Sequence, residues 1–254
     1  MERGSLQARH ERLAQLVTTV SPVSYARDRL LPVVPVLEPL LPDGGLARGS
    51  IIGCRGAAAM SITLAAAAGA SAAGSWLAVV GLPSLGLRAA SEVGIALERL
   101  VMIGEVPNLD ETAWANMTAA LIDGFDLVAI RSGPHIRAGT ARRLQARLQA
   151  RGAVLIVVGN PGRFTCDVVI SVQSATWEGL GDGAGRLARR RLTLLASGRR
   201  LARPRQAEVW LPGADGGIEA VCDPSVCDPS VCDPSVCAPA VSASVRTVAL
   251  QQAG

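Results

Sequence analysis

A short segment between a predicted strand and a predicted helix has the form of a degenerate phosphate-binding loop. A working loop reads G-x-x-x-x-G-K-[ST], in which backbone N–H groups and the lysine bind phosphate and the hydroxyl holds Mg²⁺. Here the segment runs from Gly56 to Thr63, and Ser61 and Ile62 replace the second glycine and the lysine. Because the Ile62 side chain is uncharged, we expect no bound nucleotide, no metal and no other cofactor.

Two other strand ends lack the carboxylates that an ATPase needs. The predicted strand 126–130 is followed by Arg131, a cation where Mg²⁺ would need an anion. The predicted strand 76–80 also ends without an acidic residue. We therefore expect no catalytic residues, an Ile62 side chain that fills the former pocket, and an Arg131 paired with a carboxylate. Two alternatives stay open: a domain that never bound nucleotide, and a diverged ATPase whose cation comes from Arg55, Arg131 or a partner subunit.

The composition restricts the chemistry further. The 254 residues contain no lysine, so all 25 basic residues are arginine, and the formal net charge is +4. A mildly basic chain is compatible with nucleic acid. His10 and His135 stand alone in the sequence, and the cysteines lack metal-ligand spacing, so neither a triad nor a metal site is expected. Without a secretory signal or an apolar run of membrane length, we expect a cytoplasmic protein with reduced thiols.

The elements that would position these residues alternate between apolar strands and helices. Such alternation is typical of βαβ units on a parallel sheet that is buried on both faces. Predicted strands are 50–54, 76–80, 100–103, 126–130, 153–158 and 167–172, and predicted helices are 62–73, 86–98, 110–123 and 138–151. Two later strands, 190–197 and 207–212, fit an antiparallel hairpin at the sheet edge.

The chain divides into three parts. Residues 1–40 hold an amphipathic helix at 5–17, which could dock on a partner or on its own core, and a proline-rich lead-in. Residues 41–219 form the α/β core. Residues 220–254 contain the repeat CDPSV, and a proline every five residues predicts a disordered tail.

Clustered arginines are candidates for direct contact with DNA phosphates. One group lies on the predicted helix 138–151, and the other surrounds the predicted hairpin. The candidates are Arg142, Arg143, Arg147, Arg189, Arg190, Arg191, Arg199 and Arg200. The alternative is a solvated basic face, which the apparent lack of aromatic stacking platforms favours.

The segment 41–56 resembles the lead into the phosphate loop of RecA-type recombinases, with Gly45, Leu46, Gly49 and Gly56 in the matching places. The order and spacing of the later segments fit as well, over about residues 40–175. Within that superfamily the chain is most similar to ImuA-type accessory proteins, whose actinobacterial branch has a degenerate nucleotide site.

The resemblance implies a RecA-like fold and a non-catalytic adaptor in damage-induced, error-prone translesion DNA synthesis. The implied partner is an ImuB-type inactive homologue of the Y-family polymerases and, through it, the mutagenic polymerase and the sliding clamp. A single-stranded DNA-binding protein that uses the arginine-rich surface and a diverged RecA-type ATPase stay open as alternatives.

Overall fold

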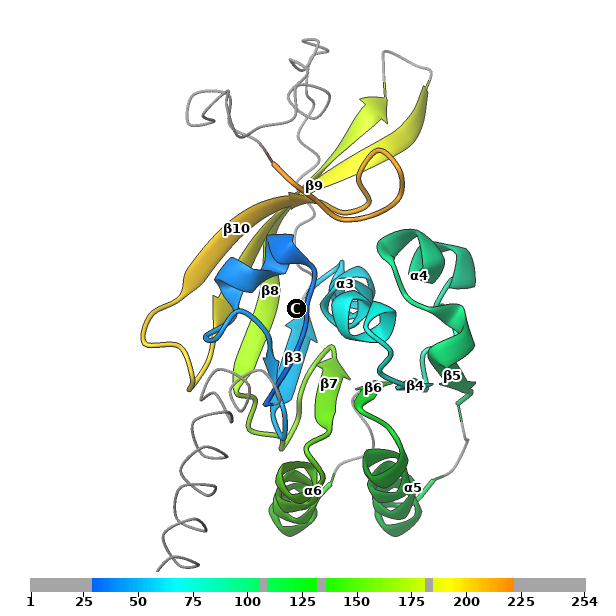
Figure 1. The fold of residues 1–254 in the computed structure, drawn as a ribbon, viewed down its shortest axis with the longest axis vertical. Coiled ribbons are helices and arrows are strands. Elements are labelled where there is room, and N and C mark those ends of the chain that lie inside the picture. Colours follow the sequence, from blue (N-terminus) through cyan, green and yellow to red (C-terminus); the bar gives the residue numbers. More distant parts are fainter. Residues whose placement is uncertain (1–28, 106–108, 132–135, 181–184, 222–254) are drawn as a thin grey trace, which may run out of the picture.

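The computed structural model describes residues 29–105, 109–131, 136–180 and 185–221. A large sheet has the strand order β11-β10-β9-β8-β3-β7-β6-β4-β5, in which the strands from β8 to β5 are parallel and the remaining pairs are antiparallel (Figure 1). The strands are β3 (Ile51–Arg55), β4 (Leu77–Val80), β5 (Leu100–Ile103), β6 (Leu127–Arg131), β7 (Val154–Val158), β8 (Val168–Leu180), β9 (Gly185–Ser197), β10 (Arg205–Trp210) and β11 (Glu219–Ala220). This confirms the predicted α/β class and its antiparallel edge.

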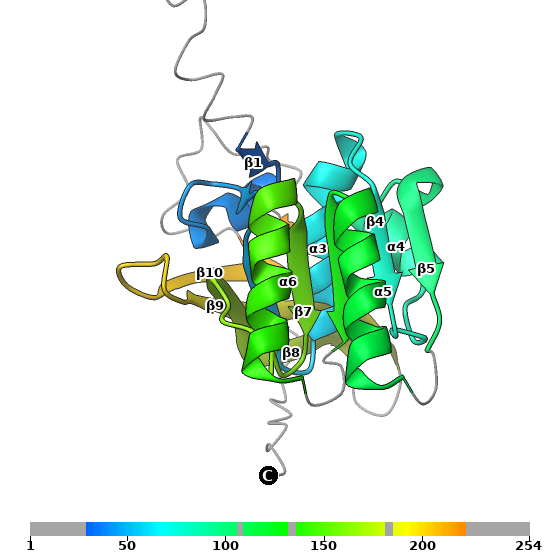
Figure 2. The ribbon, with the colours of Figure 1, turned by 90° about the horizontal axis from the view of Figure 1, so that it is seen from below.

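Helices cover both faces of the parallel part of the sheet. On one face, α3 (Ala59–Ala72) and α4 (Leu87–Val93), followed by the short η2 (Leu97–Arg99), pack over an aliphatic core. On the other face lie α5 (Glu111–Gly124) and α6 (Ala138–Arg151), side by side (Figure 2). Strands buried on both faces explain the continuous apolar runs in the sequence.

Local chemistry fixes where these helices begin and end. The Asp110 carboxylate accepts a hydrogen bond from the backbone N–H of Ala113 at 2.7 Å and so caps α5. At the end of α6, Gly152 adopts a left-handed conformation with φ of 71°, which glycine reaches without strain. The predicted helix at 86–98 is shorter in the structure, because Gly94 turns left-handed after Val93.

The end of the proline-rich lead-in is part of the same core. The strand β1 (Leu30–Leu31) pairs with β2 (Leu46–Ala47), and the 3-10 helix η1 (Pro35–Leu40) buries Leu37 and Leu40. The chain at Val33 passes so close to Gly69 of α3 that a Cβ there would lie 2.5 Å from the Val33 carbonyl carbon. The core therefore starts no later than residue 30. The helix predicted at 5–17 and the tail after 221 lie outside the described residues.

The antiparallel part contains an element that the sequence did not predict. The predicted strand 167–172 continues to Leu180, and the strand predicted at 190–197 starts at Gly185. Because β3 pairs with β8 only as far as Ser171 and β10 pairs with β9 only from Arg191, the rest of the two strands forms a two-stranded arm. Residues 172–180 and 185–190, called the arm below, project beyond the sheet (Figure 1).

Candidate functional site

The segment predicted as a degenerate phosphate loop lies between β3 and α3, at the carboxyl edge of the sheet. The helix starts at Ala59, so only Gly56 to Ala58 remain as a loop. The N–H of Ala59 donates to the Gly56 carbonyl at 3.0 Å, and the N–H of Ile62 donates to the Ala58 carbonyl at 2.9 Å. These two amides, which a working loop would direct at a phosphate, are engaged in the first helical turn.

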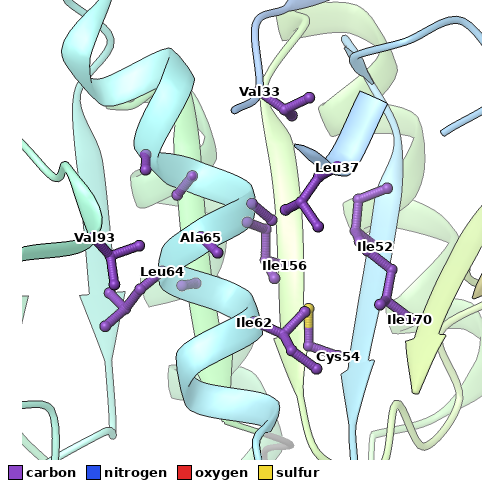
Figure 3. Packing of buried hydrophobic residues seen from close by; sticks show 14 of the residues in the cluster. Val33, Leu37, Ile52, Cys54, Ile62, Leu64, Ala65, Val93, Ile156 and Ile170 are labelled. Atoms are coloured by element: carbon purple, nitrogen blue, oxygen red, sulfur yellow. The ribbon is translucent and has the colours of Figure 1, made fainter. Parts of the chain in front are cut away.

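Apolar packing fills the space under this loop. The Ile62 side chain, expected inside the domain, is 1 % exposed and points toward Cys54 of β3 (Figure 3). The hydroxyl of Thr63 donates to the Ala59 carbonyl at 2.8 Å within the same helix. Burial raises the pKa of the Cys54 thiol to about 12, although a hydrogen bond with Thr63 works in the opposite direction. Ile62 and Thr63, in the lysine and hydroxyl positions, are therefore buried parts of the core.

Arg131 pairs only loosely with a carboxylate. Its Nη1 atom lies 4.0 Å from Oε1 of Glu105, and both side chains are more than half exposed. An ion pair this long and this exposed contributes little to stability. The end of β6 thus presents a solvated cation at the carboxyl edge.

A cation from a distant part of the chain, Arg190 of β9, also contacts the loop segment, although the sequence placed it only among the DNA candidates. Its guanidinium donates to the Ser61 hydroxyl at 3.1 Å and to the Leu211 carbonyl at 2.8 Å. It also lies 5.0 Å from the Trp177 ring centroid. Partial burial lowers the pKa of Arg190. The arm is thereby fastened over the N-terminal turn of α3, at the position of the second loop glycine.

The arm and the neighbouring β10 each supply an aromatic ring that the sequence did not lead us to expect there. Trp177, opposite Arg190 in the β8–β9 register, is 39 % exposed. On β10, Trp210 lies under the Arg189 guanidinium at 4.1 Å. The signal in the sequence was a tryptophan within thirteen residues of an arginine run, but without the β8–β9 register nothing placed them together.

The predicted DNA-contacting arginines do not form one surface. Arg142, Arg143 and Arg147 lie on α6, on the face of the sheet that α5 shares, whereas the others belong to β9 or to the turn that follows it. Several are paired with carboxylates. These pairs are Arg147 with Asp123, Arg189 with Glu178, Arg191 with Glu208, Arg199 with Asp167 and Arg200 with Asp43.

Asp123 and a second carboxylate, Glu111, also hold α5 and α6 together. A hydrogen bond from Arg147 keeps the pKa of Asp123 below its usual value, and Arg151 adds to the effect. The Glu111 carboxylate accepts from the Thr140 hydroxyl and from the Arg137 N–H, which lowers its pKa. The basic face of α6 therefore has a structural role.

Among the pockets at the amino edge of the sheet, opposite to the loop, two are lined by several charged side chains. One, of about 310 Å³, lies between α5 and α6. Its charged lining residues are Arg48, Arg151, Asp123 and Asp126. The other, of about 380 Å³, lies in front of β3 and β8. Its lining residues are Arg48, Gly49, Ser50, Gln149, Asp167, Arg199 and Arg200.

Among the described residues, no group of three His, Cys, Asp or Glu side chains is arranged to hold a metal ion. In the same part of the chain, no helix combines the length and the apolar character needed to cross a bilayer.

The α/β part of the chain is similar to known proteins. Residues 39–162 match the family model described as "MT3502 N-terminal domain". The chain is also 34% identical over 160 residues to "Uncharacterized protein Rv3395c" of Mycobacterium tuberculosis (strain ATCC 25618 / H37Rv), which covers 62% of this chain and 72% of that protein. The family match spans the loop, both helix layers and β7, and it ends before the arm. The chain belongs to the MT3502 N-terminal domain family.

Proposed function

We propose that this protein is a non-catalytic RecA-like adaptor in damage-induced, error-prone translesion DNA synthesis. The observation that supports the non-catalytic part is the buried Ile62 in the lysine position of the phosphate loop. A triphosphate needs cations and free amides at this position. Here the first turn of α3 is already hydrogen-bonded and its underside is apolar.

The topology supports a RecA-like origin. The strand β3 lies between β7 and β8. The chain runs from β3 to β4 on one side of β3 and from β7 to β8 on the other side, so the loop after β3 lies where the direction of the connections changes. In open α/β sheets ligands bind at such points, beyond the carboxyl ends of the strands. A loop with the residue types of a lost phosphate site, found at this place, fits a nucleotide-binding ancestor.

The partners come from the resemblance of residues 41–56 to ImuA-type proteins. They would be an ImuB-type homologue of the Y-family polymerases and, through it, the error-prone polymerase and the sliding clamp. An adaptor needs surface that is free to bind, and the arm exposes Trp177 and Leu187, at 39 % and 49 %. Exposed apolar side chains on a projecting element are typical of interaction surfaces.

Two measurements test this proposal. Calorimetry of the purified chain with ATP and Mg²⁺ at millimolar concentration should give no binding heat. The chain should also co-elute in size-exclusion chromatography with the ImuB-type homologue from the same genome. ATP hydrolysis that is lost in a Thr63→Ala variant would show that the loop is functional, and failure to co-elute would remove the adaptor.

Direct binding of single-stranded DNA is a second candidate function, favoured by the Trp177 and Arg190 pair. Sequence-tolerant binding of single strands needs an aromatic ring for stacking beside cations for phosphates. The exposed Trp177 ring lies beside Arg190, for which the described residues offer no carboxylate within salt-bridge distance. The exposed part of the Trp177 ring is the surface on which a base would stack, although the sequence led us to expect no such ring.

Fluorescence anisotropy with a labelled oligothymidine tests this candidate at several salt concentrations. Trp177→Leu should weaken binding several-fold, since stacking contributes about 1–3 kcal/mol per base. Trp76→Leu, the same change at a tryptophan of similar exposure just before β4, is the matched control. Equal affinity in the Trp177→Leu variant and the wild type would exclude the arm as the binding element.

A further inference from the structure

The larger of these two pockets of the amino edge brings together three guanidinium groups that the adaptor function does not explain. Three arginines and one aspartate line it, and they come from different parts of the chain. Arg48 follows β2, whereas Arg199 and Arg200 follow β9. Each of the three is paired with one aspartate, Arg48 with Asp126, Arg199 with Asp167 and Arg200 with Asp43. The feature of this pocket, which we call the Ser50 pocket, is thus the meeting of three guanidinium groups and not an excess of charge.

The guanidinium groups of the Ser50 pocket have N–H donors that are not used in hydrogen bonds with the described residues. A guanidinium has five N–H donors. Arg48 donates through Nη1 alone, to Asp126 and to the Gly152 carbonyl, both at 3.3 Å. Arg200 donates through Nη2 alone, to Asp43 at 3.4 Å. Within the described part of the chain, the Nε atoms of both arginines have no acceptor, so each can bind a further anion.

Asp167 holds the third arginine in place. Nε and Nη2 of Arg199 lie 2.9 and 2.8 Å from Oδ1 of Asp167, whose other oxygen accepts the Ile51 N–H at 2.9 Å. Asp167 is 5 % exposed, and its carboxylate is thus occupied by donors from two sides. Nη1 of Arg199 is left without an acceptor among the described residues. The aspartate consequently orients a cation at the pocket.

A buried hydroxyl completes the pocket. Ser50 is 3 % exposed, and its Oγ atom is the one buried side-chain polar atom among the described residues that has no hydrogen-bond partner. A buried hydroxyl without a partner costs about 1–3 kcal/mol. Ser50 also lines the pocket, and because its Oγ atom is closed off from solvent, a ligand oxygen can accept its hydrogen bond only after the atoms that cover Oγ move aside.

We propose that the Ser50 pocket binds a phosphate group of a small ligand, with Arg48, Arg199 and Arg200 as its cations and Ser50 as a neutral donor. Phosphate matches the site because guanidinium groups donate to two of its oxygens at once, and hydroxyls donate to the others. The site lies at the opposite end of β3 from the lost phosphate loop, and it stands independently of the adaptor function.

Calorimetry with sodium pyrophosphate on the full chain at low salt is the direct test. Pyrophosphate should bind with one site per chain. Arg200→Gln should weaken binding about tenfold, as expected for the loss of a charge-assisted hydrogen bond. Arg142→Gln, with the same change of charge on an exposed turn of α6, should leave binding unchanged. No binding heat, or equal losses in the two variants, would overturn the site.

Ser50→Ala separates binding from folding. Removing an unpartnered hydroxyl should leave the denaturation midpoint unchanged or higher, while pyrophosphate binding falls several-fold. A Ser50→Ala variant that binds like the wild type would remove the hydroxyl from the site. Competition distinguishes the phosphate source: an oligothymidine that binds through Arg200 and resists displacement by pyrophosphate would assign the pocket to nucleic acid and overturn the small-ligand proposal.

Discussion

The two edges of the sheet differ in a way that reverses the usual arrangement of an α/β domain. At the carboxyl edge, where such folds commonly bind ligands, Ile62 and Cys54 pack under a loop that has become helix. At the amino edge, arginines and aspartates line open pockets. Ile62, in the position that a phosphate loop gives to its lysine, is part of this core. The protein then retains the fold while its polar cavities lie at the other edge.

The largest effect should come from returning the charge to the closed edge. Ile62→Lys places an ammonium in an apolar core and should lower the free energy of unfolding by at least about 3 kcal/mol in urea denaturation. Ile62→Leu is the matched control and should cost less than about 1.5 kcal/mol. A lysine variant as stable as the wild type would mean that the carboxyl edge still has room for a solvated charge.

At the amino edge, the buried carboxylate should matter most. Asp167→Ala leaves Arg199 and the Ile51 N–H without their acceptor and should cost about 3 kcal/mol by urea denaturation. Asp43→Ala removes only an exposed partner of Arg200 and should change stability by less than about 1 kcal/mol. Similar losses in both variants would show that burial does not separate the two ion pairs.

The dependence of the free energy of unfolding on pH reports whether water reaches the core at the carboxyl edge. The raised pKa of Cys54 means that the unfolded thiol loses its proton above pH 9.0, whereas the folded thiol keeps it up to about 12. Stability should therefore be independent of this group below pH 9.0 and fall by about 1.4 kcal/mol per pH unit above it.

Chemical denaturation between pH 8 and pH 10.5 would measure this slope. Cys166, whose pKa burial raises to about 11, contributes in the same direction, so Cys54→Ala should remove only part of the slope. An unchanged slope in Cys54→Ala would mean that water reaches the Cys54 thiol.

The smallest effect should come from the exposed ion pairs of the amino edge. Arg48→Gln loses a bond to Asp126 and one to the Gly152 carbonyl, both part-exposed, and should cost about 0.5–1 kcal/mol in thermal denaturation. It should nevertheless weaken pyrophosphate binding as strongly as Arg200→Gln does. A large stability loss would show that this edge is a structural seal instead of a binding surface.

Local sequence determined much of the parallel half. Continuous apolar runs predict strands buried on both faces, and β5 and α6 have the predicted bounds. Capping residues such as Asp110 and Gly152 act within one turn, so their effect is visible in the sequence. The position of Ile62, where a phosphate loop would have its lysine, could likewise be identified from spacing alone.

Only the tertiary structure decided the rest. The arm depends on pairing between β8 and β9, in which polar residues such as Thr176 and Arg191 face each other. These segments have no apolar pattern from which the two strands could be predicted. Arg190 reaches Ser61 across 129 positions of the chain, and the Ser50 pocket assembles arginines from separate segments. Periodicity reports what a segment buries, whereas contacts between distant polar side chains depend on how the strands are ordered and registered in the sheet.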